Sequence, residues 1–368
     1  MKVLHIVTRM NTGGPAVFLD HLTTAMGELG VNSTIAFGFC EANETDYTEN
    51  NIMRAELIKI KALHRSLNPI DDIRAFIQIR GIIKAIKPDL INTHTSKAGV
   101  LGRIAAKTTN LEIKVVHTYL GHLIYGYFNR PKIWIFMSIE KIMAKFTSAA
   151  IAVTTETMQS LVSNGVGKKL KWETIRIGLP ITKPDKSYLS PESKIKILWV
   201  GRFTGIKDPS FAIETMRELS QKKPNNFELI MVGGGELFDE IKESAESLDV
   251  KFIGWMVEPF NKLTDFDLLM MTSKNEGLPL VILEAARYSK ATISTNVGGV
   301  SEFIEDNKTG YLVSRDPGLM ATKILAIAEN KTRLYEIGVN ARRLLESDFS
   351  AQHMAKLHFD LYSKLTKN

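Results

Sequence analysis

Two carboxylates eight residues apart form the most informative chemical feature of this sequence. Glu276 and Glu284 lie in the segment NEGLPLVILEAARY, directly after the apolar run Asp267–Thr272. Such a run is typical of a buried strand, and Pro279 suits the first turn of a helix, where its missing N–H is not needed. We therefore expect Glu276 in a strand-to-helix turn. We expect Glu284 about a turn and a half into a helix that begins at Pro279.

The start of this predicted helix adds a second chemical property. Backbone N–H groups in the first turn of a helix have no partner within the helix, and they attract anions. A diphosphate at this position, with a carboxylate on each side to accept hydrogen bonds from sugar hydroxyls, has the shape of a nucleotide-sugar.

Two cations follow the predicted strand Ile195–Val200. Arg202 and Lys207 lie five residues apart in the loop GRFTGIKD, where both can reach one diphosphate and neutralise a leaving nucleoside diphosphate. Solvated surface charges are the alternative interpretation of these two residues. A Gly13–Gly14 turn follows the first strand, and glycine lets a ligand approach the backbone closely. The dinucleotide fingerprint GxGxxG is absent, as is the acidic residue that would hold the ribose of NAD.

The chain is long enough for two domains, and its strands and helices alternate as in parallel sheets covered by helices. We predict an α/β protein with two doubly wound, Rossmann-like domains facing an interdomain cleft, where ligands bind at the carboxyl ends of strands. The domains are residues 1–185 and 186–349, followed by a C-terminal segment, 350–368, that is helical over Ser350–Leu365. The last strand predicted in the first half is Thr174–Ile177, and the proline-containing stretch Thr182–Lys194 is the linker.

Histidines stand at the ends of two predicted strands in the first half, where ligands of such sheets bind. His94 precedes Lys97 at one strand end, and His117 and His122 flank another. Core packing is an equal alternative for each of these histidines. His5 lies inside a strand, so we expect it to be packed.

The pair Asp265 and Asp267 has the spacing of a metal-binding DxD motif. Asp267 begins an apolar strand, so this pair is expected away from the carboxyl ends of the strands. We therefore expect neither a metal nor a cofactor.

Charge and cysteine usage limit the compartment and the partners. Residues 1–185 hold 23 Lys/Arg and 15 Asp/Glu, a charge of +8, whereas the remainder holds 24 and 25. The basic half suits a membrane surface or an acceptor that carries a diphosphate, and no basic, aromatic-interleaved motif indicates nucleic acid. Aromatic residues beside cations in Tyr125–Phe146 suit a membrane interface or a core. The single cysteine, the lack of a signal peptide and the lack of an apolar span favour the cytoplasm.

Taken together, these segments resemble the retaining glycosyltransferases of family four, which have the GT-B fold. The parts occur in the family's order over essentially the whole chain: the Gly13–Gly14 turn, HTSKAGVLGR, Arg202 with Lys207, Glu276 with Glu284, and a closing helix. HTSKAGVLGR and HTYLGHLIYGYF are similar to the branch that builds capsule, O-antigen and other lipid-linked surface glycans in bacteria.

The resemblance implies a function and a role for each site residue. The family transfers a sugar from a nucleoside-diphosphate sugar, here expected to be UDP-linked, with retention and without a metal. The acceptor is lipid-diphosphate-linked or a growing glycan, and the enzyme lies in the cytoplasm or peripherally on the inner membrane. The closing helix is implied to cross back to the first domain. The resemblance implies that Gly13 and Gly14 approach the donor phosphate or the sugar, and that Arg202 and Lys207 bind the diphosphate. Glu276, the Gly277 and Leu278 amides and Pro279 are implied to contact the transferred sugar. Glu284 is implied to bind the ribose, and the backbone near Ile253–Gly254 is implied to bind the base.

One position departs from the family pattern. Leu120 stands where the family has a histidine that contacts the donor sugar, and His122 or His117 could substitute for it. This departure keeps open a non-catalytic sugar-nucleotide-binding protein, and the shared architecture keeps open a non-hydrolysing UDP-sugar epimerase. A glycosidase is disfavoured because the carboxylates flank an anion-binding helix start.

Overall fold

A computed structural model describes residues 1–368 with the exception of 42–43, 122–129, 182–193, 257 and 368. The described residues form two compact units. The first contains the chain up to Pro180 and the segment from Phe349 onward, and the second contains the residues from Ile181 to Asp348. Both units are α/β, and every strand pair in both sheets is parallel. The predicted linker, Thr182–Lys194, lies almost entirely outside the described residues.

The first unit is built on a seven-stranded sheet in the order β3-β2-β1-β4-β5-β6-β7. The strands are β1 (Lys2–Arg9), β2 (Asn32–Gly38), β3 (Glu56–Lys59), β4 (Leu90–His94), β5 (Lys114–Tyr119), β6 (Ala149–Ala152) and β7 (Lys171–Thr174). The helices are α1 (Gly14–Glu28), α2 (Tyr47–Asn50), α3 (Pro69–Ile86), α4 (Ser96–Lys107), α5 (Arg130–Met143), the 3₁₀ turn η1 (Ala144–Phe146), α6 (Thr155–Ser163) and α13 (Ala351–Thr366).

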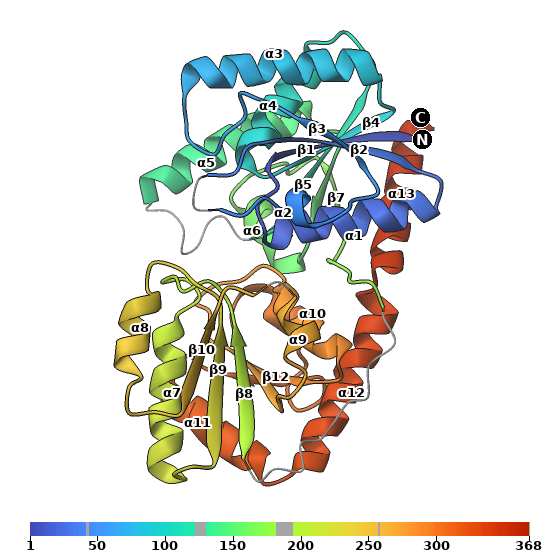
Figure 1. The fold of residues 1–368 in the computed structure, drawn as a ribbon. Coiled ribbons are helices and arrows are strands. Elements are labelled where there is room, and N and C mark those ends of the chain that lie inside the picture. Colours follow the sequence, from blue (N-terminus) through green and yellow to red (C-terminus); the bar gives the residue numbers. More distant parts are fainter. Residues whose placement is uncertain (42–43, 122–129, 182–193, 257, 368) are drawn as a thin grey trace. The chain divides into compact units, whose positions relative to one another are not determined.

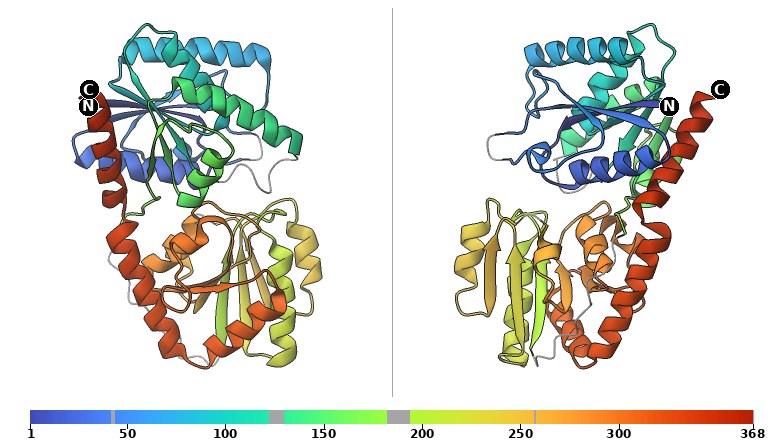
Figure 2. Two further views of the ribbon diagram at one scale, coloured as in Figure 1. Left: turned by 180° about the vertical axis from the view of Figure 1, so that it is seen from behind. Right: turned by 45° about the vertical axis from the view of Figure 1, so that its right-hand side comes forward.

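Side-chain alternation along β1 divides the helices of this unit between the two faces of the sheet. Leu4 and Ile6 point to one face, where they share a buried cluster with residues of α3 and α4. α3, α4 and α5 gather on that side, and α1 packs with α13 on the other (Figures 1 and 2). His5, between Leu4 and Ile6, points to the α1 and α13 face, because successive side chains of a strand alternate.

The C-terminal helix α13 is tied to the first unit by polar contacts inside it. Asn92 of β4 donates a hydrogen bond of 2.6 Å to the Tyr362 hydroxyl. Ahead of the helix, Leu179 and Phe349–Ala351 exchange backbone hydrogen bonds. A Cβ on Gly178 would lie 2.2 Å from the Ser350 carbonyl oxygen, so only glycine permits this close approach.

Three buried histidines stand beside this attachment. His5 Nδ1 lies 3.1 Å from His94 Nε2, and the His358 ring of α13 packs against Phe18, which also contacts His94. The prediction that His5 is packed is confirmed, since it is fully buried. Burial, followed by repulsion from His358, lowers the pKa of His5 to about 3, and burial lowers the pKa of His358 to about 4. Burial also holds the pKa of His94 well below its usual value.

The second unit has a six-stranded sheet in the order β10-β9-β8-β11-β12-β13. The strands are β8 (Ile195–Val200), β9 (Phe227–Val232), β10 (Val250–Gly254), β11 (Leu268–Met271), β12 (Ala291–Thr295) and β13 (Tyr311–Val313). The helices are α7 (Pro209–Lys222), α8 (Phe238–Ser244), α9 (Pro259–Lys262), α10 (Leu280–Arg287), the 3₁₀ turn η2 (Gly298–Glu302), α11 (Pro317–Ala328) and α12 (Lys331–Asp348).

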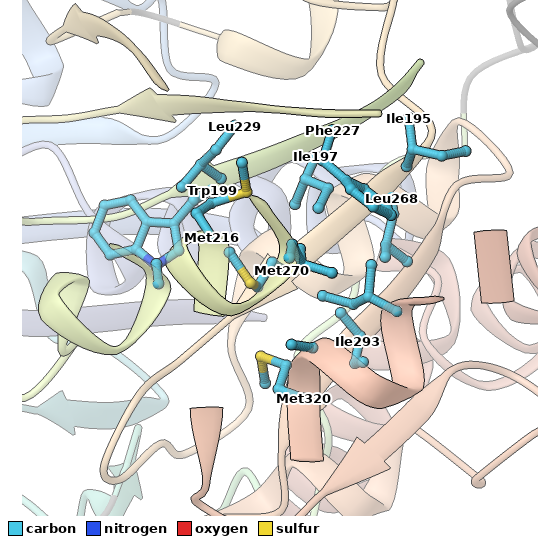
Figure 3. Close-up of a cluster of buried hydrophobic side chains, with 14 of the residues drawn as sticks. Ile195, Ile197, Trp199, Met216, Phe227, Leu229, Leu268, Met270, Ile293 and Met320 are labelled. Atoms are coloured by element: carbon cyan, nitrogen blue, oxygen red, sulfur yellow. The ribbon is translucent and has the colours of Figure 1, made fainter. Parts of the chain in front are cut away.

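An apolar core fixes this second sheet beneath its helices (Figure 3). Ile197, Met270 and Ile293 from three adjacent strands are at most 1% exposed, and they share one cluster with Met216 of α7 and Met320 of α11. Full burial of a side chain of this size stabilises the fold by about 1.5–3 kcal/mol. The core therefore holds the strand order on which the positions of the intervening loops depend.

Two predicted elements have other bounds in the structure, and one helix was missed. The last strand of the first unit is Lys171–Thr174 and not Thr174–Ile177, because backbone pairing with β6 selects Lys171–Thr174 despite its polar residues. The helix predicted to begin at Pro279 begins at Leu280, since Pro279 has extended backbone angles and occupies the N-cap position. The helix α12 was not predicted. None of the described helices is long and apolar enough to span a membrane.

The three buried histidines predict that acid weakens the first unit. Because burial lowers their folded-state pKa values, the unfolded chain takes up protons first as the pH falls below about 6.5. The contribution of these histidines to the free energy of unfolding is therefore fully present above about pH 6.5. It decreases by on the order of a few kcal/mol by about pH 4. Urea unfolding measured across this range should show a smaller pH dependence for His358→Leu than for the unmodified protein. An unchanged slope would contradict the interpretation.

Candidate active site

An ion pair joins two loops at the carboxyl ends of neighbouring strands in the second unit. β8 pairs with β11, so the loops that follow these strands lie side by side. Lys207 Nζ lies 2.5 Å from Glu276 Oε1, and Ser273 Oγ donates to the same oxygen at 2.6 Å. The structure thus brings one of the two predicted cations into contact with the first predicted carboxylate.

Thr272 connects the backbones of the same two loops. Its hydroxyl lies 2.9 Å from the carbonyl oxygens of both Lys207 and Asp208, and it accepts a hydrogen bond from Trp199 Nε1. Thr272 is fully buried. A buried hydroxyl with partners on both sides restricts both loops, so the Lys207 backbone is held where its side chain reaches Glu276.

Arg315 is a second connection, and the sequence analysis missed it. Its guanidinium donates to the carbonyl oxygens of Thr272 and Ser273 at 3.2 Å and to Asp208 Oδ2 at 2.6 Å. Asp208 itself has a left-handed backbone, with φ of 50°. A non-glycine residue in that region needs support from its surroundings, and the Arg315 pair supplies it. The only sequence signal was a cation two residues after the strand β13.

Gly298 fixes the backbone of Glu276 from the next strand connection. Its φ is +53°, and a Cβ at this position would lie 1.9 Å from the Glu276 carbonyl oxygen. The Gly299 N–H donates to that same oxygen at 3.3 Å. The glycine turn after β12 therefore packs against the Glu276 backbone.

Glu284 occupies the fifth position of α10. Burial raises the pKa of its carboxyl to about 7, while Arg287 opposes the rise and Glu258 adds to it. No hydrogen bond to this carboxylate comes from the part of the chain that the structure describes. A carboxylate that is desolvated and without a donor is suited to accept hydrogen bonds from ligand hydroxyls.

α10 begins without a side-chain cap at Pro279. Gly277 and Leu278 immediately precede this start, in the turn that also contains Glu276. The first-turn amides of this helix and the turn before it therefore carry donors that are available to an anion.

The remaining candidates of the second unit lie at the carboxyl ends of β8 and β10. Arg202 is exposed, and its guanidinium makes no hydrogen bond or ion pair with any residue that the structure describes. The Gly254 carbonyl accepts from Gly233 N–H at 2.8 Å, next to Ile253, which is 41% exposed. A Cβ on Gly233 would lie 1.9 Å from the Gly201 carbonyl oxygen, so the glycine loop Gly233–Gly235 serves close packing.

The Asp265 and Asp267 pair lies at the other end of its strand. Asp267 precedes β11 and accepts from the Lys196 N–H at 2.9 Å, while Asp265 binds Lys196 Nζ at 2.5 Å. The predicted location, away from the strand's carboxyl end, is confirmed.

In the first unit, the histidines of the predicted site point inward. His94 is fully buried beside His5, and His117 is 2% exposed with its Nδ1 2.8 Å from the Thr93 hydroxyl. Burial, together with repulsion from Arg103, lowers the pKa of His117 well below its usual value. His122 lies outside the described residues. The structure therefore gives His94 and His117 core positions, and neither ring is exposed to a ligand.

The other residues of HTSKAGVLGR are also held by neighbours. Lys97 forms an ion pair with Asp72 and donates to the Ser66 carbonyl at 2.6 Å. Arg103 is fully buried and binds both oxygens of Glu140 at 2.9 Å. This segment joins α4 to α3 and α5.

The Gly13–Gly14 turn has the expected place after the first strand. Gly13 precedes α1, and Gly14 is the first residue of that helix. The nearest atoms that a Cβ on Gly13 would meet belong to Asn11, at 3.8 Å and beyond. This helix start is uncrowded and has no side-chain cap.

Two protein-family models match this chain. Residues 12–176 match the family "Glycosyltransferase Family 4", and residues 181–344 match "Glycosyl transferases group 1". The chain is a family-four glycosyltransferase. The two matches occupy separate halves of the sequence, in the order that the resemblance predicted.

Curated relatives of this glycosyltransferase act in bacterial surface glycan synthesis. One, from Escherichia coli, is named UDP-Gal:alpha-D-GlcNAc-diphosphoundecaprenol alpha-1,3-galactosyltransferase; it is 25% identical over 88% of this chain and 87% of its own length. A Campylobacter jejuni alpha-1,4-N-acetyl-D-galactosaminyltransferase, named for a PP-undecaprenol acceptor, is 24% identical over 96% of each chain. The glycosyltransferase CapM of Staphylococcus aureus capsular polysaccharide biosynthesis is 22% identical over 81% of this chain and 82% of its own.

Solved structures confirm the GT-B fold. Anabaena Alr3699/HepE in complex with UDP-glucose has a TM-score of 0.79 at 20% identity, covering 99% of this chain and all of its own. Sucrose-phosphate synthase from Thermosynechococcus elongatus has a TM-score of 0.82 at 18% identity and covers both chains fully.

Arg315 provides a test of the loop arrangement. Arg315→Gln removes the charged hydrogen bond to Asp208, which should loosen the Lys207 loop and weaken UDP binding about tenfold. Titration calorimetry measures the affinity. Arg333→Gln is the matched control, because Arg333 pairs with Glu336 on α12 in the same unit. Equal UDP affinity in both variants would show that Arg315 does not position the site.

Proposed function

We propose that this glycosyltransferase moves a hexose or N-acetylhexosamine from a UDP-sugar to a lipid-diphosphate-linked or growing glycan acceptor. Its product would enter surface polysaccharide synthesis. The proposal includes retention at the anomeric carbon, metal-independent transfer, and action at the cytoplasmic face of the inner membrane. The observation that carries it is the Lys207–Glu276 pair beside the uncapped start of α10. Relatives named for UDP-galactose and diphosphoundecaprenol support the donor and acceptor classes.

The donor would use each of these groups for a separate part of the molecule. Lys207, with Arg202 in the same loop, faces the diphosphate, and the amides at the start of α10 add partial positive charge. Glu276 and the turn Gly277–Leu278 hold hydroxyls of the transferred sugar. Glu284 accepts hydrogen bonds from the ribose, and the backbone at Ile253–Gly254 meets the base.

The proposed reaction is a front-face displacement. The acceptor hydroxyl oxygen bonds to the anomeric carbon on the side from which UDP leaves. The bond between that carbon and the β-phosphate oxygen breaks, and its electrons remain on UDP. The acceptor proton passes to a β-phosphate oxygen of the donor. Lys207 stabilises the charge that develops on the leaving diphosphate, so no protein carboxylate has to act as the base.

Transfer with purified components tests the reaction. UDP-sugars and a polyprenyl-diphosphate acceptor, incubated in the presence of EDTA, should yield UDP and a lipid of increased mass. The anomeric coupling constant of the product should show an α linkage. Interconversion of UDP-sugars without transfer would favour the epimerase, and binding without either reaction would favour the non-catalytic alternative.

Lys207→Ala and Glu276→Ala should each lower turnover by at least about tenfold, because each removes a charged contact to the donor. Lys308→Ala is the matched control, since Lys308 forms an exposed pair with Glu305 elsewhere in the unit. Thermal unfolding confirms that the variants are folded. Near-normal turnover of both site variants would remove the site assignment.

Glu284 predicts a pH dependence of nucleotide binding. Ribose hydroxyls donate to the ionised carboxylate, whose pKa in the free protein is raised to about 7. UDP affinity should therefore rise as the pH increases through about 7. Glu284→Gln should bind UDP more weakly and should lose the pH dependence that ionisation of Glu284 causes. Any pH dependence caused by ionisation of UDP itself should be the same in both proteins. Parallel pH profiles of the two proteins in calorimetric titrations would refute the role.

A further inference from the structure

α5 presents an unusual outer surface on the first unit. Trp134, Ile135, Ile139 and Ile142 are 72%, 53%, 38% and 52% exposed. At 3.6 residues per turn these four positions fall on one side of the helix. We define them as the α5 apolar stripe.

The opposite side of α5 already packs into the unit. Met137 is buried with Tyr119 and Ala150, and Ile133 and Phe136 pack against the same cluster. Glu140, also buried, binds Arg103. The core requirement of α5 is therefore met without the stripe. A helix that is apolar on both sides indicates a second apolar environment.

Positive charge borders the stripe. Lys132 and Lys141 are exposed, and the helical spacing puts them at opposite edges of the stripe; Lys145 follows in η1. The only acidic residue of α5 is Glu140, which is buried. Lysine stems can lie along apolar surface while their ammonium groups stay at a polar, anionic interface.

We propose that the α5 apolar stripe inserts into the headgroup region of an anionic lipid bilayer, with Lys132 and Lys141 contacting lipid phosphates. A tryptophan among isoleucines, flanked on α5 by Lys132 and Lys141, matches an interfacial helix. The basic charge of residues 1–185, +8, adds long-range attraction to such a surface. The inference extends the proposed function, because a lipid-linked acceptor would be presented at the same surface. Its test needs no sugar transfer.

α3 is the competing surface, and its charges favour it less. Ile70, Ile73 and Ile77 are each more than 60% exposed on one side of that helix. α3 carries Arg74, Arg80 and Lys84, but Asp71 and Asp72 lie in its first turn. It therefore presents charge of both signs, and carboxylates are repelled by anionic lipid.

Vesicle sedimentation of the full chain tests the proposal. The unmodified protein should bind vesicles of phosphatidylcholine with phosphatidylglycerol more tightly than vesicles of phosphatidylcholine alone. Trp134→Ser combined with Ile142→Ser should weaken binding to the anionic vesicles at least about tenfold. Trp134→Phe should retain most of the binding. Lys132→Gln with Lys141→Gln should reduce the preference for anionic vesicles.

Controls come from the second unit. Leu319→Ser removes an apolar side chain that is 54% exposed on α11, and Lys242→Gln with Lys262→Gln removes two exposed lysines. Both controls should bind vesicles normally. UDP titration and thermal unfolding show that each protein is folded.

Three outcomes would overturn the proposal: no preference of the unmodified protein for anionic vesicles, unchanged binding by the Trp134/Ile142 double variant, or equal losses in the Leu319 control. Light scattering that reveals a dimer dissociated by the double variant, without vesicle binding, would assign the stripe to a second copy of the chain. Normal vesicle binding without any sugar transfer would instead reject the proposed function and leave this inference intact.

Discussion

The parallel pairing of β8 with β11 determines the chemistry of the second unit. It sets the loop that contains Lys207 beside the turn that contains Glu276, although the two residues are far apart in the sequence. Thr272 bonds the backbones of both loops, Arg315 reaches both from β13, and Gly298 packs on the Glu276 carbonyl. Three separate strand connections therefore hold one ion pair, and that redundancy preorganises the site before any ligand binds.

The ion pair also balances charge between the two loops. Lys207 and Glu276 neutralise each other, so neither is left desolvated without a partner. A diphosphate that reached Lys207 would replace one anionic partner with another, and the Glu276 oxygens would then be available to sugar hydroxyls. Glu284 has no such partner among the described residues, and burial accordingly raises the pKa of its carboxyl to about 7. The two carboxylates of the same segment therefore lie in different electrostatic environments.

In the first unit, several of the histidines and charged residues singled out from the sequence lie in the interior. His5, His94 and His358 are buried between β1, β4 and α13, and Arg103 with Glu140 is buried between α4 and α5. Burial of these histidines lowers their pKa values and predicts that acid weakens the attachment of the C-terminal helix. Burial of the arginine pair fixes α5 to the sheet, and the outer side of α5 then remains available for contacts beyond the unit.

Local sequence patterns predicted the two parallel-sheet units, most of their strands and the segments that carry Lys207, Glu276 and Glu284. Apolar periodicity, glycine turns and charge spacing are local properties, and they predict local structure. β7 was misplaced because its register depends on pairing with β6. Only the tertiary structure showed that Lys207 contacts Glu276, that Arg315 supports them, and that His94 and His117 lie in the core. Those outcomes depend on which distant strands become neighbours and which side chains lose water, and spacing along one chain records neither.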